Sequence, residues 1–399
     1  MAFDVERARA DTPGCHEVVH LNNAGSSLPP RPVLDAQIEW LQQEAVTGGY
    51  ELATRRVSDR HRVYQRVAAL VGARPEEIAL VENATFAWHQ AFWSLPLQPG
   101  DRVLTCEVEY ASNYLSYLQA VGRRGIVIEV IPSDEDGQID TGALAEMLAG
   151  DGTTGGGRGR VGLVAVTHVP TNGGVVNPVE EIGRLTRAAG VPFLLDACQS
   201  VGQLPVDVEA IGCDFLAATG RKWLRAPRGT GFLYVRAERL DELQPAFLDL
   251  LGATWVEPDR YELRADARRF ENWESNLAAV IGLGEAVAYA QGWGIDAIAE
   301  RVTGLAAGLR QQLGAVPGVE VRDLGRQPSG IVTFTKAGVE AEIVQQRLAE
   351  QGINVSVTHG ESTLLDTERR RLPALVRASI HYYNDESEAD RFCHAVGAL

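Results

Sequence analysis

Residues 192–222 read PFLLDACQSVGQLPVDVEAIGCDFLAATGRK and contain two short apolar runs, each of which ends in polar side chains. Runs of this length that alternate with amphipathic stretches are typical of a mainly parallel sheet covered by helices. The first run ends at Asp196, and the second ends at Thr219, shortly before Lys222. Because ligands of open α/β sheets bind at the carboxyl ends of the strands, we expect Asp196 and Lys222 to face one crevice.

The same alternation continues on both sides of this stretch, so we predict an α/β fold. Further strands are expected over residues 101–105, 126–131, 161–166 and 229–235, with helices over 114–121, 141–148 and 178–189. Beyond about residue 255, long helical segments are joined by short strands at 331–334 and 376–381. The predicted organisation is an N-terminal arm (1–20), a large domain (21–255) and a smaller α+β C-terminal domain (256–399).

The composition limits the class of protein. The 399 residues carry 37 Lys and Arg against 53 Asp and Glu, which gives a formal net charge of −16, and 45% of them are hydrophobic. This composition is not that of a disordered chain, and it argues against nucleic acid or an anionic membrane as the partner. The five cysteines form no CxxC pair, and neither a signal peptide nor a membrane-spanning run is visible. We therefore expect a cytoplasmic protein.

One short motif suggests a zinc site. His16-Glu17-Val18-Val19-His20 satisfies the HExxH pattern of zinc peptidases, which places two histidines one helical turn apart. Here the segment follows Pro13-Gly14 and contains paired valines, which favours a short strand. Histidines four positions apart in a strand are about 13 Å apart, too far for one ion. We expect no metal, and a zinc metallopeptidase is kept as a remote alternative.

Residues 151–160 (DGTTGGGRGR) are rich in glycine. A dinucleotide-binding glycine loop follows a strand and opens a helix, whereas this stretch precedes a predicted strand. We interpret it as a surface connection.

An anion site is predicted at Glu82-Asn83-Ala84-Thr85. This turn opens an apolar helical stretch, so free backbone N–H groups and the Thr85 hydroxyl are available to a phosphate. An anion pocket, a buried acid and a lysine are the three parts that pyridoxal 5′-phosphate requires. The phosphate is anchored, the acid keeps the pyridine nitrogen protonated, and the lysine forms a Schiff base.

At this point the chain resembles a known family, the class V aminotransferases of fold-type I, which includes cysteine desulfurases, selenocysteine lyases and isopenicillin N epimerase. The resemblance covers almost the whole chain and rests on six ordered motifs: ENAT (82–85), THVPTNGGVVNP (167–178), DACQSVGQLPVDV (196–208), GRKWLRAPRGTGFLYV (220–235), RFENWESN (269–276) and VRASIHYYN (376–384). It implies a mainly parallel sheet in a large cofactor-binding domain, a smaller C-terminal domain, and a homodimer with a shared active site.

The resemblance also implies residue roles. Lys222 would form the Schiff base, Asp196 would bind the pyridine nitrogen, and Gln199 would bind the phenolic oxygen, with Thr171 close to it. The phosphate would be held by Ala84, Thr85 and Thr219. Arg377 would bind the α-carboxylate of an amino-acid substrate as a bidentate fork, and the backbone at Ala24 and Gly25 would approach that substrate.

Two further positions stay open. Tyr110 is a candidate for stacking on the cofactor or handling a proton, with a core residue as the alternative. Family members also place a phosphate contact to the neighbouring subunit within RFENWESN. Glu274 would repel a phosphate, so the alternatives are Ser275, Asn276, Arg225 or Arg228.

The departures from the family guide the predicted reaction. Desulfurases carry a nucleophilic cysteine on a loop before the carboxylate-binding arginine, whereas residues 354–372 contain no cysteine. Cys198, beside the cofactor acid, is interpreted as a small buried residue. The leading prediction is a C–S lyase that acts by β-elimination on a cysteine-type substrate. An aminotransferase or an amino-acid epimerase is the alternative, since both start from the same Cα carbanion.

Overall fold

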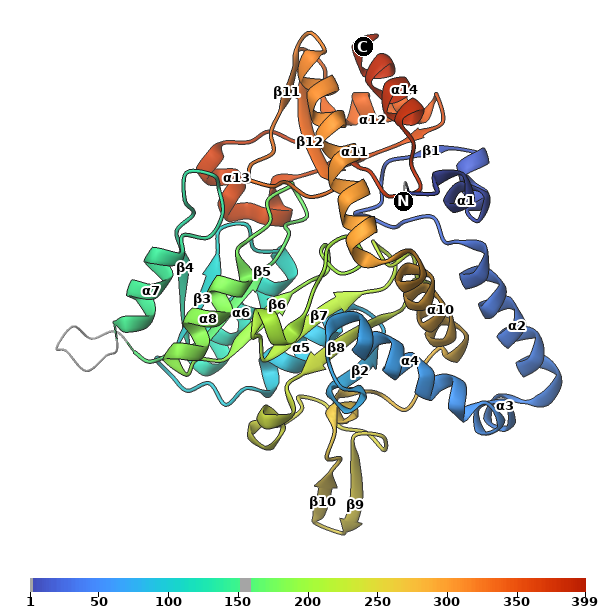
Figure 1. Cartoon of the computed structure of the whole chain (residues 1–399). Helices are drawn as coiled ribbons and strands as arrows, with labels where there is room; N and C mark the ends of the chain where they lie inside the picture. Colours follow the sequence, from blue (N-terminus) through green and yellow to red (C-terminus); the bar gives the residue numbers. More distant parts are fainter. Residues whose placement is uncertain (1–2, 151–158) are drawn as a thin grey trace.

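The computed structural model describes residues 3–150 and 159–399. The central sheet has seven strands in the order β2-β8-β7-β6-β5-β3-β4 (Figure 1). Their bounds are β2 (Ile78–Val81), β3 (Arg102–Cys106), β4 (Val127–Ile131), β5 (Val161–Thr167), β6 (Phe193–Asp196), β7 (Phe215–Thr219) and β8 (Gly231–Val235). From β4 to β7 all neighbours are parallel, and β8 is antiparallel to both β7 and β2. The prediction of a mainly parallel sheet is confirmed.

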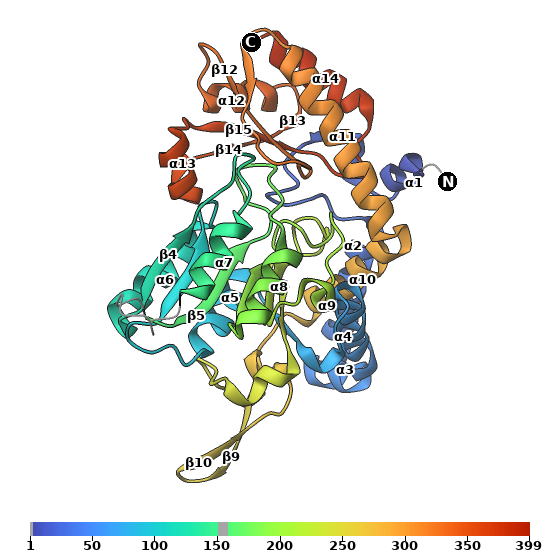
Figure 2. The same ribbon diagram turned by 60° about the vertical axis from the view of Figure 1, so that its left-hand side comes forward.

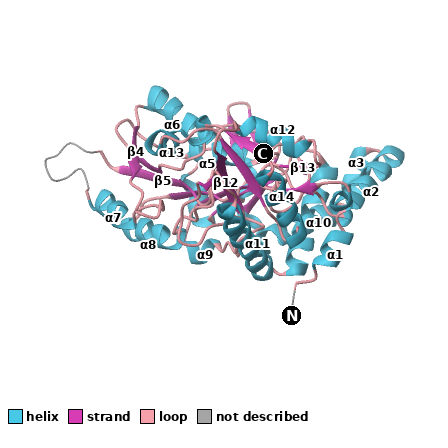
Figure 3. Cartoon of the chain, turned by 90° about the horizontal axis from the view of Figure 1, so that it is seen from above, coloured by secondary structure: helices cyan, strands magenta, loops and turns pink. Residues whose placement is uncertain are grey.

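Both faces of this sheet are buried, because successive side chains of each strand point to opposite sides. In β6, Leu194 packs with residues of α5 (Ala84–Ser94) and α6 (Ala111–Arg124), whereas Phe193 and Leu195 belong to a second cluster. That second cluster includes residues of α7 (Thr141–Ala149), α8 (Val179–Ala189) and α9 (Val208–Ile211). Figure 3 shows the helices on the two sides of the sheet. The sheet is therefore fixed from both faces.

The C-terminal part forms a second, antiparallel sheet of four strands in the order β11-β12-β15-β14. These are β11 (Val319–Val321), β12 (Ile331–Lys336), β14 (Ser356–Thr358) and β15 (Leu375–Ser379), and they carry α11 (Ile295–Ala315), α12 (Ala341–Ala349), α13 (Leu364–Arg370) and α14 (Glu386–Gly397). This part lies above the large sheet in Figures 1 and 2. The domain boundaries at residues 20 and 255 stay predictions.

The N-terminal segment contacts both parts. After α1 (Val5–Ala10), strand β1 (Val19–His20) pairs in parallel with β13 (Ile353–Asn354) of the C-terminal part. The chain then continues into α2 (Arg31–Thr47), α3 (Gly49–Arg55) and α4 (Val57–Val71), and α10 (Leu277–Trp293) packs against α2 and α4. A hairpin of β9 (Ala253–Glu257) and β10 (Arg260–Leu263), which the sequence prediction missed, projects from the opposite end of the molecule (Figures 1 and 2).

A buried arginine ties these segments together. Arg225 is 1% exposed and adopts a left-handed backbone conformation with φ of 61°. Its guanidinium donates to the Leu28 carbonyl at 2.8 Å, to Tyr382 Oη at 2.8 Å and to Thr12 Oγ1, and it lies 4.3 Å from the ring centre of Tyr383. Arg225 therefore joins the N-terminal segment to the C-terminal part from within the β7–β8 loop, which also carries Lys222.

The HExxH segment is not a single strand. Residues Pro13–His16 form a 3₁₀ turn, and only Val19 and His20 are in strand β1. His20 has partners at both ring nitrogens, because Nε2 is 2.9 Å from the Ser26 carbonyl and Nδ1 is 3.2 Å from Asn354 Nδ2. Over residues 3–150 and 159–399, no group of three or more His, Cys, Asp or Glu is arranged to hold a metal ion.

The predicted glycine-rich connection at 151–160 lies outside the described residues up to position 158. Within the part of the chain that the structure describes, no helix is long and apolar enough to cross a membrane.

Candidate active site

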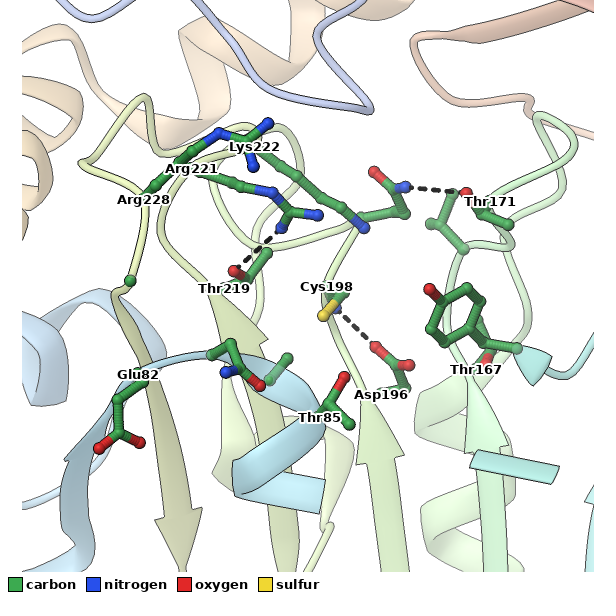
Figure 4. Close-up of a pocket in the computed structure, with 16 residues that line it drawn as sticks. Glu82, Thr85, Thr167, Thr171, Asp196, Cys198, Thr219, Arg221, Lys222 and Arg228 are labelled. Atoms are coloured by element: carbon green, nitrogen blue, oxygen red, sulfur yellow. Dashed lines mark hydrogen bonds between the residues drawn. The ribbon is translucent and has the colours of Figure 1, made fainter. Parts of the chain in front are cut away.

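A pocket of about 540 Å³ lies at the carboxyl ends of β5, β6 and β7, where the first turn of α5 meets them (Figure 4). It brings together most of the residues that the sequence singled out. Eight of them line it: Ala84, Thr85, Tyr110, Thr171, Asp196, Gln199, Thr219 and Lys222. The crevice expected between Asp196 and Lys222 is therefore present.

Asp196 ends β6 at the floor of this pocket and is 6% exposed. Its two oxygens are held separately. Oδ1 accepts from the Cys198 backbone N–H at 2.9 Å, and Oδ2 accepts from Asn113 Nδ2 at 2.9 Å. Both contacts fix the plane of the carboxylate, so the acid is presented to the pocket in one orientation.

Lys222 follows β7 and reaches into the pocket above Asp196 and Cys198 (Figure 4). Burial lowers the pKa of its amine, and the nearby cations Arg221 and Arg377 act in the same direction. The full sequence holds only two lysines, Lys222 and Lys336. Lys336 ends β12, and its Nζ donates to the Pro317 carbonyl at 2.9 Å. Any Schiff base in this pocket must therefore use Lys222.

The first turn of α5 forms the predicted anion site. Asn83 is the N-cap, and its Oδ1 accepts from the Phe86 backbone N–H at 2.9 Å. The backbone N–H groups of Ala84 and Thr85 have no acceptor within the helix, as at any helix start, and they face the pocket. A side chain at Gly231 would come within 3.1 Å of the Asn83 backbone, so glycine allows β8 to approach this turn closely.

Positive charge gathers at this anion site. Arg221 donates from Nη1 to Thr219 Oγ1 at 3.3 Å, as Figure 4 shows, and Arg228 also lines the pocket. In the described part of the chain, no ion pair is found for Arg221, Lys222, Arg228 or Arg377. An acidic chain that leaves four cations without acidic partners around one cavity has a site suited to anions.

Gln199, Thr171 and Arg377 form one connected group. Gln199 Nε2 donates to the Ala24 carbonyl at 3.2 Å and lies 3.5 Å from Thr171 Oγ1, and Gln199 Oε1 accepts from Trp223 Nε1 at 2.9 Å. Thr171 accepts from Arg377 Nη1 through its hydroxyl at 2.8 Å and through its carbonyl at 3.0 Å. Thr171 thus connects Arg377 to the wall of the pocket.

Arg377 is held by neutral partners. Besides Thr171, its Nε donates to Ser356 Oγ at 3.0 Å and its Nη2 donates to Asn22 Oδ1 at 3.3 Å. Burial lowers the pKa of its guanidinium to about 10, and repulsion by Arg221 adds to this lowering. A carboxylate ligand would relieve both effects.

Ala24 and Gly25 lie beside the pocket and are not part of its lining. The Ala24 backbone N–H donates to Ser379 Oγ at 2.8 Å, and a side chain at Gly25 would come within 2.6 Å of Asn22 Oδ1. Glycine at this position therefore preserves the contact between Asn22 and Arg377.

Tyr110 is the N-cap of α6, lines the pocket, and is 37% exposed. The alternative of a core residue is therefore wrong, whereas its stacking role stays a prediction. Of the proposed phosphate contacts, Arg225 is also wrong, since its guanidinium is bound as described above. Asn276 caps α10 by accepting from the Ala279 N–H at 2.9 Å.

Sequence reasoning missed two residues behind the pocket, Glu109 and Asn113. Asn113 Nδ2 donates to Asp196 Oδ2 and also to Glu109 Oε1, both at 2.9 Å. The sequence signal was weak: Glu109, Asn113 and Tyr117 are spaced by four, as on one face of a helix, but Glu109 lies in the turn before α6.

Comparison with known proteins identifies the family. The model of the family "Aminotransferase class-V" matches residues 19–392. The chain belongs to this family. A probable cysteine desulfurase of Methanothermobacter thermautotrophicus is 31% identical over 96% of this chain and 95% of its own length. A cysteine desulfurase of Serratia proteamaculans is 29% identical over 98% and 97%.

Solved structures of class-V proteins share the fold. The apo structure of a cysteine desulfurase from Thermococcus onnurineus NA1 matches 100% of this chain and 98% of its own, with a TM-score of 0.91 and 28% identity. A cystine C–S lyase in complex with cysteine persulfide matches 97% and 99%, with a TM-score of 0.85. At 24% identity this second likeness shows the fold alone. The predictions of family, fold-type I architecture and pyridoxal-phosphate dependence are confirmed.

The residues of the pocket fit pyridoxal 5′-phosphate. The one lysine that reaches the pocket supplies the amine, Asp196 supplies an acid whose orientation is fixed, and the start of α5 supplies phosphate donors next to Arg221 and Thr219. The individual roles carried over from the family stay proposals for these residues.

Proposed function

We propose that this protein is a pyridoxal-phosphate-dependent C–S lyase that acts on cysteine or a cysteine conjugate by β-elimination. The observation that carries the proposal is a pocket that combines Lys222 and Asp196 with the adjacent Arg377, while residues 354–372 contain no cysteine. The cysteine desulfurase names of relatives and of a structural neighbour support a sulfur-containing substrate. The missing cysteine argues that the sulfur leaves the enzyme directly.

When bound, the cofactor supplies the electron sink that makes the substrate Cα acidic. The chain would hold the cofactor at three places: Lys222 Nζ at its aldehyde carbon, Asp196 at its ring nitrogen, and Ala84, Thr85, Thr219 and Arg221 at its phosphate. Gln199 Nε2 would donate to the phenolic oxygen in place of Thr171 Oγ1, the longer of its two contacts. Arg377 and Tyr110 are not used in these cofactor contacts, so they remain available to bind the substrate.

Arg377 is proposed to hold the substrate α-carboxylate. A guanidinium has five N–H groups, and four of those in Arg377 have the neutral partners described above. One Nη2 hydrogen has no partner among the described residues, and the Asn22 contact at 3.3 Å is the longest of the four. A bidentate contact needs two parallel N–H groups on different nitrogens, so a substrate carboxylate would pair Nη2 with Nε or Nη1 and displace Ser356 or Thr171 there.

Lys222 is the proposed base for the Cα proton. Burial and the neighbouring arginines lower the pKa of its amine, which favours the neutral form needed to accept that proton at Nζ. Loss of the proton and of the sulfur substituent converts cysteine and water to pyruvate, ammonia and hydrogen sulfide. Tyr110, at the pocket edge, is the proposed residue for stacking or for handling a second proton.

Cys198 is not a substitute for the desulfurase cysteine. Burial raises the pKa of its thiol, and the adjacent Asp196 acts in the same direction. The thiolate needed to accept sulfur is therefore disfavoured.

The products distinguish this proposal from its alternatives. The holoenzyme is incubated with L-cysteine, L-cystine and S-alkyl cysteines, with and without a keto-acid acceptor, and pyruvate, substrate-derived keto acids, alanine, free amino-acid enantiomers and ammonia are quantified. A C–S lyase yields pyruvate and ammonia in equal amounts. Alanine as the main product would show a desulfurase, a keto acid that keeps the substrate side chain would show an aminotransferase, and a D-amino acid would show an epimerase.

We also propose a homodimer in the cytoplasm. Large apolar side chains are exposed around the β9–β10 hairpin and in the segments that precede and follow it: Phe247, Leu250, Trp255 and Trp273. Such a group of exposed apolar residues is typical of an interaction surface. All five cysteines are free thiols, which fits a reducing compartment. Sedimentation of the holoenzyme tests the dimer, and a fully active monomer would contradict it.

A further inference from the structure

Glu109 is an acid behind the pocket that the proposed mechanism does not use. It is 3% exposed, and it follows β3 in the turn that leads into α6. Its carboxylate accepts five hydrogen bonds. Oε1 accepts from Thr167 Oγ1 at 2.6 Å, from the Tyr110 N–H at 2.8 Å and from Asn113 Nδ2 at 2.9 Å. Oε2 accepts from Thr105 Oγ1 at 2.9 Å and from Tyr117 Oη at 3.2 Å. A buried acid with so many donors is fixed in place.

Asn113 connects this acid to Asp196. Its single amide nitrogen donates one hydrogen to Glu109 Oε1 and the other to Asp196 Oδ2. If the amide were turned over, its carbonyl oxygen would face two carboxylates, which cannot donate to it when ionised. Glu109 therefore helps to orient the Asn113 amide so that its NH₂ group, and not its carbonyl oxygen, faces Asp196.

We propose that Glu109 is a positioning residue for the cofactor acid. It orients the Asn113 amide, and Asn113 in turn holds Asp196 against the ring nitrogen of the cofactor. The inference rests on the proposed function, because it takes Asp196 to be the partner of that nitrogen. Tyr110, whose N–H binds the same Glu109 oxygen that Asn113 binds, is placed at the pocket edge by the same acid.

The charge of Glu109 depends on its surroundings. Burial raises the pKa of Glu109 to about 7, and repulsion by Asp196 adds to this effect. The other titratable groups that face it are Tyr117 and Cys106, and Glu109 raises the pKa of both. Measurements at about pH 8 therefore examine the ionised carboxylate.

The direct test is the Glu109→Gln variant, in which the nuclear magnetic resonance of the cofactor ring nitrogen is measured. A glutamine can offer its own N–H to Asn113 and let that amide turn over, so Asp196 loses a donor. A carboxylate that loses a donor binds a shared proton more tightly. With pyridoxal 5′-phosphate labelled with ¹⁵N at the ring, we expect the nitrogen resonance to move toward its unprotonated position. Cofactor affinity should fall about tenfold.

A double-mutant cycle tests whether Glu109 acts through Asn113. In an Asn113→Ala background, Glu109→Gln should produce little further change in the nitrogen resonance. Additive changes would contradict the proposed connection. If Glu109→Gln does not fold, Thr105→Val provides the same test, since it removes one donor to Glu109 and leaves Asn113 and Asp196 in place. A smaller shift in the same direction is then expected, and no shift would overturn the proposal.

Glu271 provides a matched control. It is also buried, and burial also raises its pKa to about 7. It accepts from Tyr64 Oη at 2.8 Å, from the Leu80 N–H at 2.8 Å and from Arg60 Nη2 at 3.3 Å, away from the pocket lining. Glu271→Gln should leave the nitrogen resonance unchanged, and a shift equal to that of Glu109→Gln would contradict a specific role.

If the cofactor fails to bind the wild-type protein at Lys222, the proposed function itself fails. Binding at Lys222 with an unchanged resonance in Glu109→Gln refutes only the role of Glu109.

Discussion

Two buried arginines differ in the role that we expect of each. Arg225, in the loop that carries Lys222, stabilises the fold, whereas Arg377, beside the pocket, is proposed to bind the substrate. The Arg225 guanidinium is bound by groups of its own chain. Burial alone would lower its pKa, but the contacts with Tyr382 and Tyr383 raise it above the usual value. The Arg377 guanidinium has only neutral partners, and burial lowers its pKa to about 10. Both guanidiniums bind only uncharged groups, but the tyrosines around Arg225 favour its charge, whereas Arg221 near Arg377 disfavours it. Substitutions in the two regions should therefore affect different properties.

The largest effect is expected for Lys222→Arg, which keeps the positive charge of the pocket but cannot form a Schiff base. Turnover should fall by at least about a thousandfold, since the covalent anchor and the proposed base are both lost. Lys336→Arg, the only other lysine substitution that the chain offers, should keep wild-type kcat. A Lys222→Arg variant with normal turnover would contradict the assignment.

Arg377→Ala should weaken use of amino-acid substrates about a hundredfold in kcat/KM, because a charged hydrogen-bonded pair with the carboxylate is lost. The matched control is cysteine amide, which lacks the carboxylate and should be processed at similar rates by variant and wild type. An equal loss for both substrates would show that Arg377 acts on the structure of the site instead.

Arg225→Met should have the opposite profile. It removes the donor to Leu28, Tyr382 and Thr12 and leaves buried oxygens unpaired, which costs about 2–4 kcal/mol of stability. The thermal midpoint should drop by several degrees. At low temperature the cofactor absorbance and KM should stay near wild type. Loss of cofactor without loss of stability would break the distinction between the two arginines.

The smallest effect is expected for Cys198→Ala. Its thiol lies in the pocket, but burial raises its pKa and the proposed elimination needs no protein thiol. Pyruvate formation should stay within about twofold of wild type. A complete loss of activity, together with a protein-bound persulfide in the wild type, would show that the sulfur passes through Cys198.

Much of this site was predictable because its parts end strands. Asp196 and Lys222 follow apolar runs, and the parallel sheet brings the ends of such runs to one edge. Thr219 also ends its strand, whereas the anion site at the first turn of α5 was predicted from the free N–H groups of a helix start. These features depend on local sequence and on a general rule of sheet topology.

Other features depend on contacts between distant segments and left no comparable signal. Arg225 was one of the alternatives for the phosphate contact, because the sequence cannot show that Leu28 and Tyr382 bind its guanidinium in the folded chain. Likewise, Glu109 and Asn113 are four positions apart in the sequence, but the bond from Asn113 to Asp196 joins residues that are 83 positions apart. The β9–β10 hairpin was missed because its strands are short and exposed, so they lack a buried apolar face.

Chemical trapping of the cofactor tests the central claim most directly. The holoenzyme is reduced with borohydride, digested, and mapped by mass spectrometry at both lysine-containing peptides. We predict a pyridoxyl group on Lys222 and none on Lys336. An adduct on Lys336, or no adduct on Lys222 in a protein saturated with cofactor, would contradict the account.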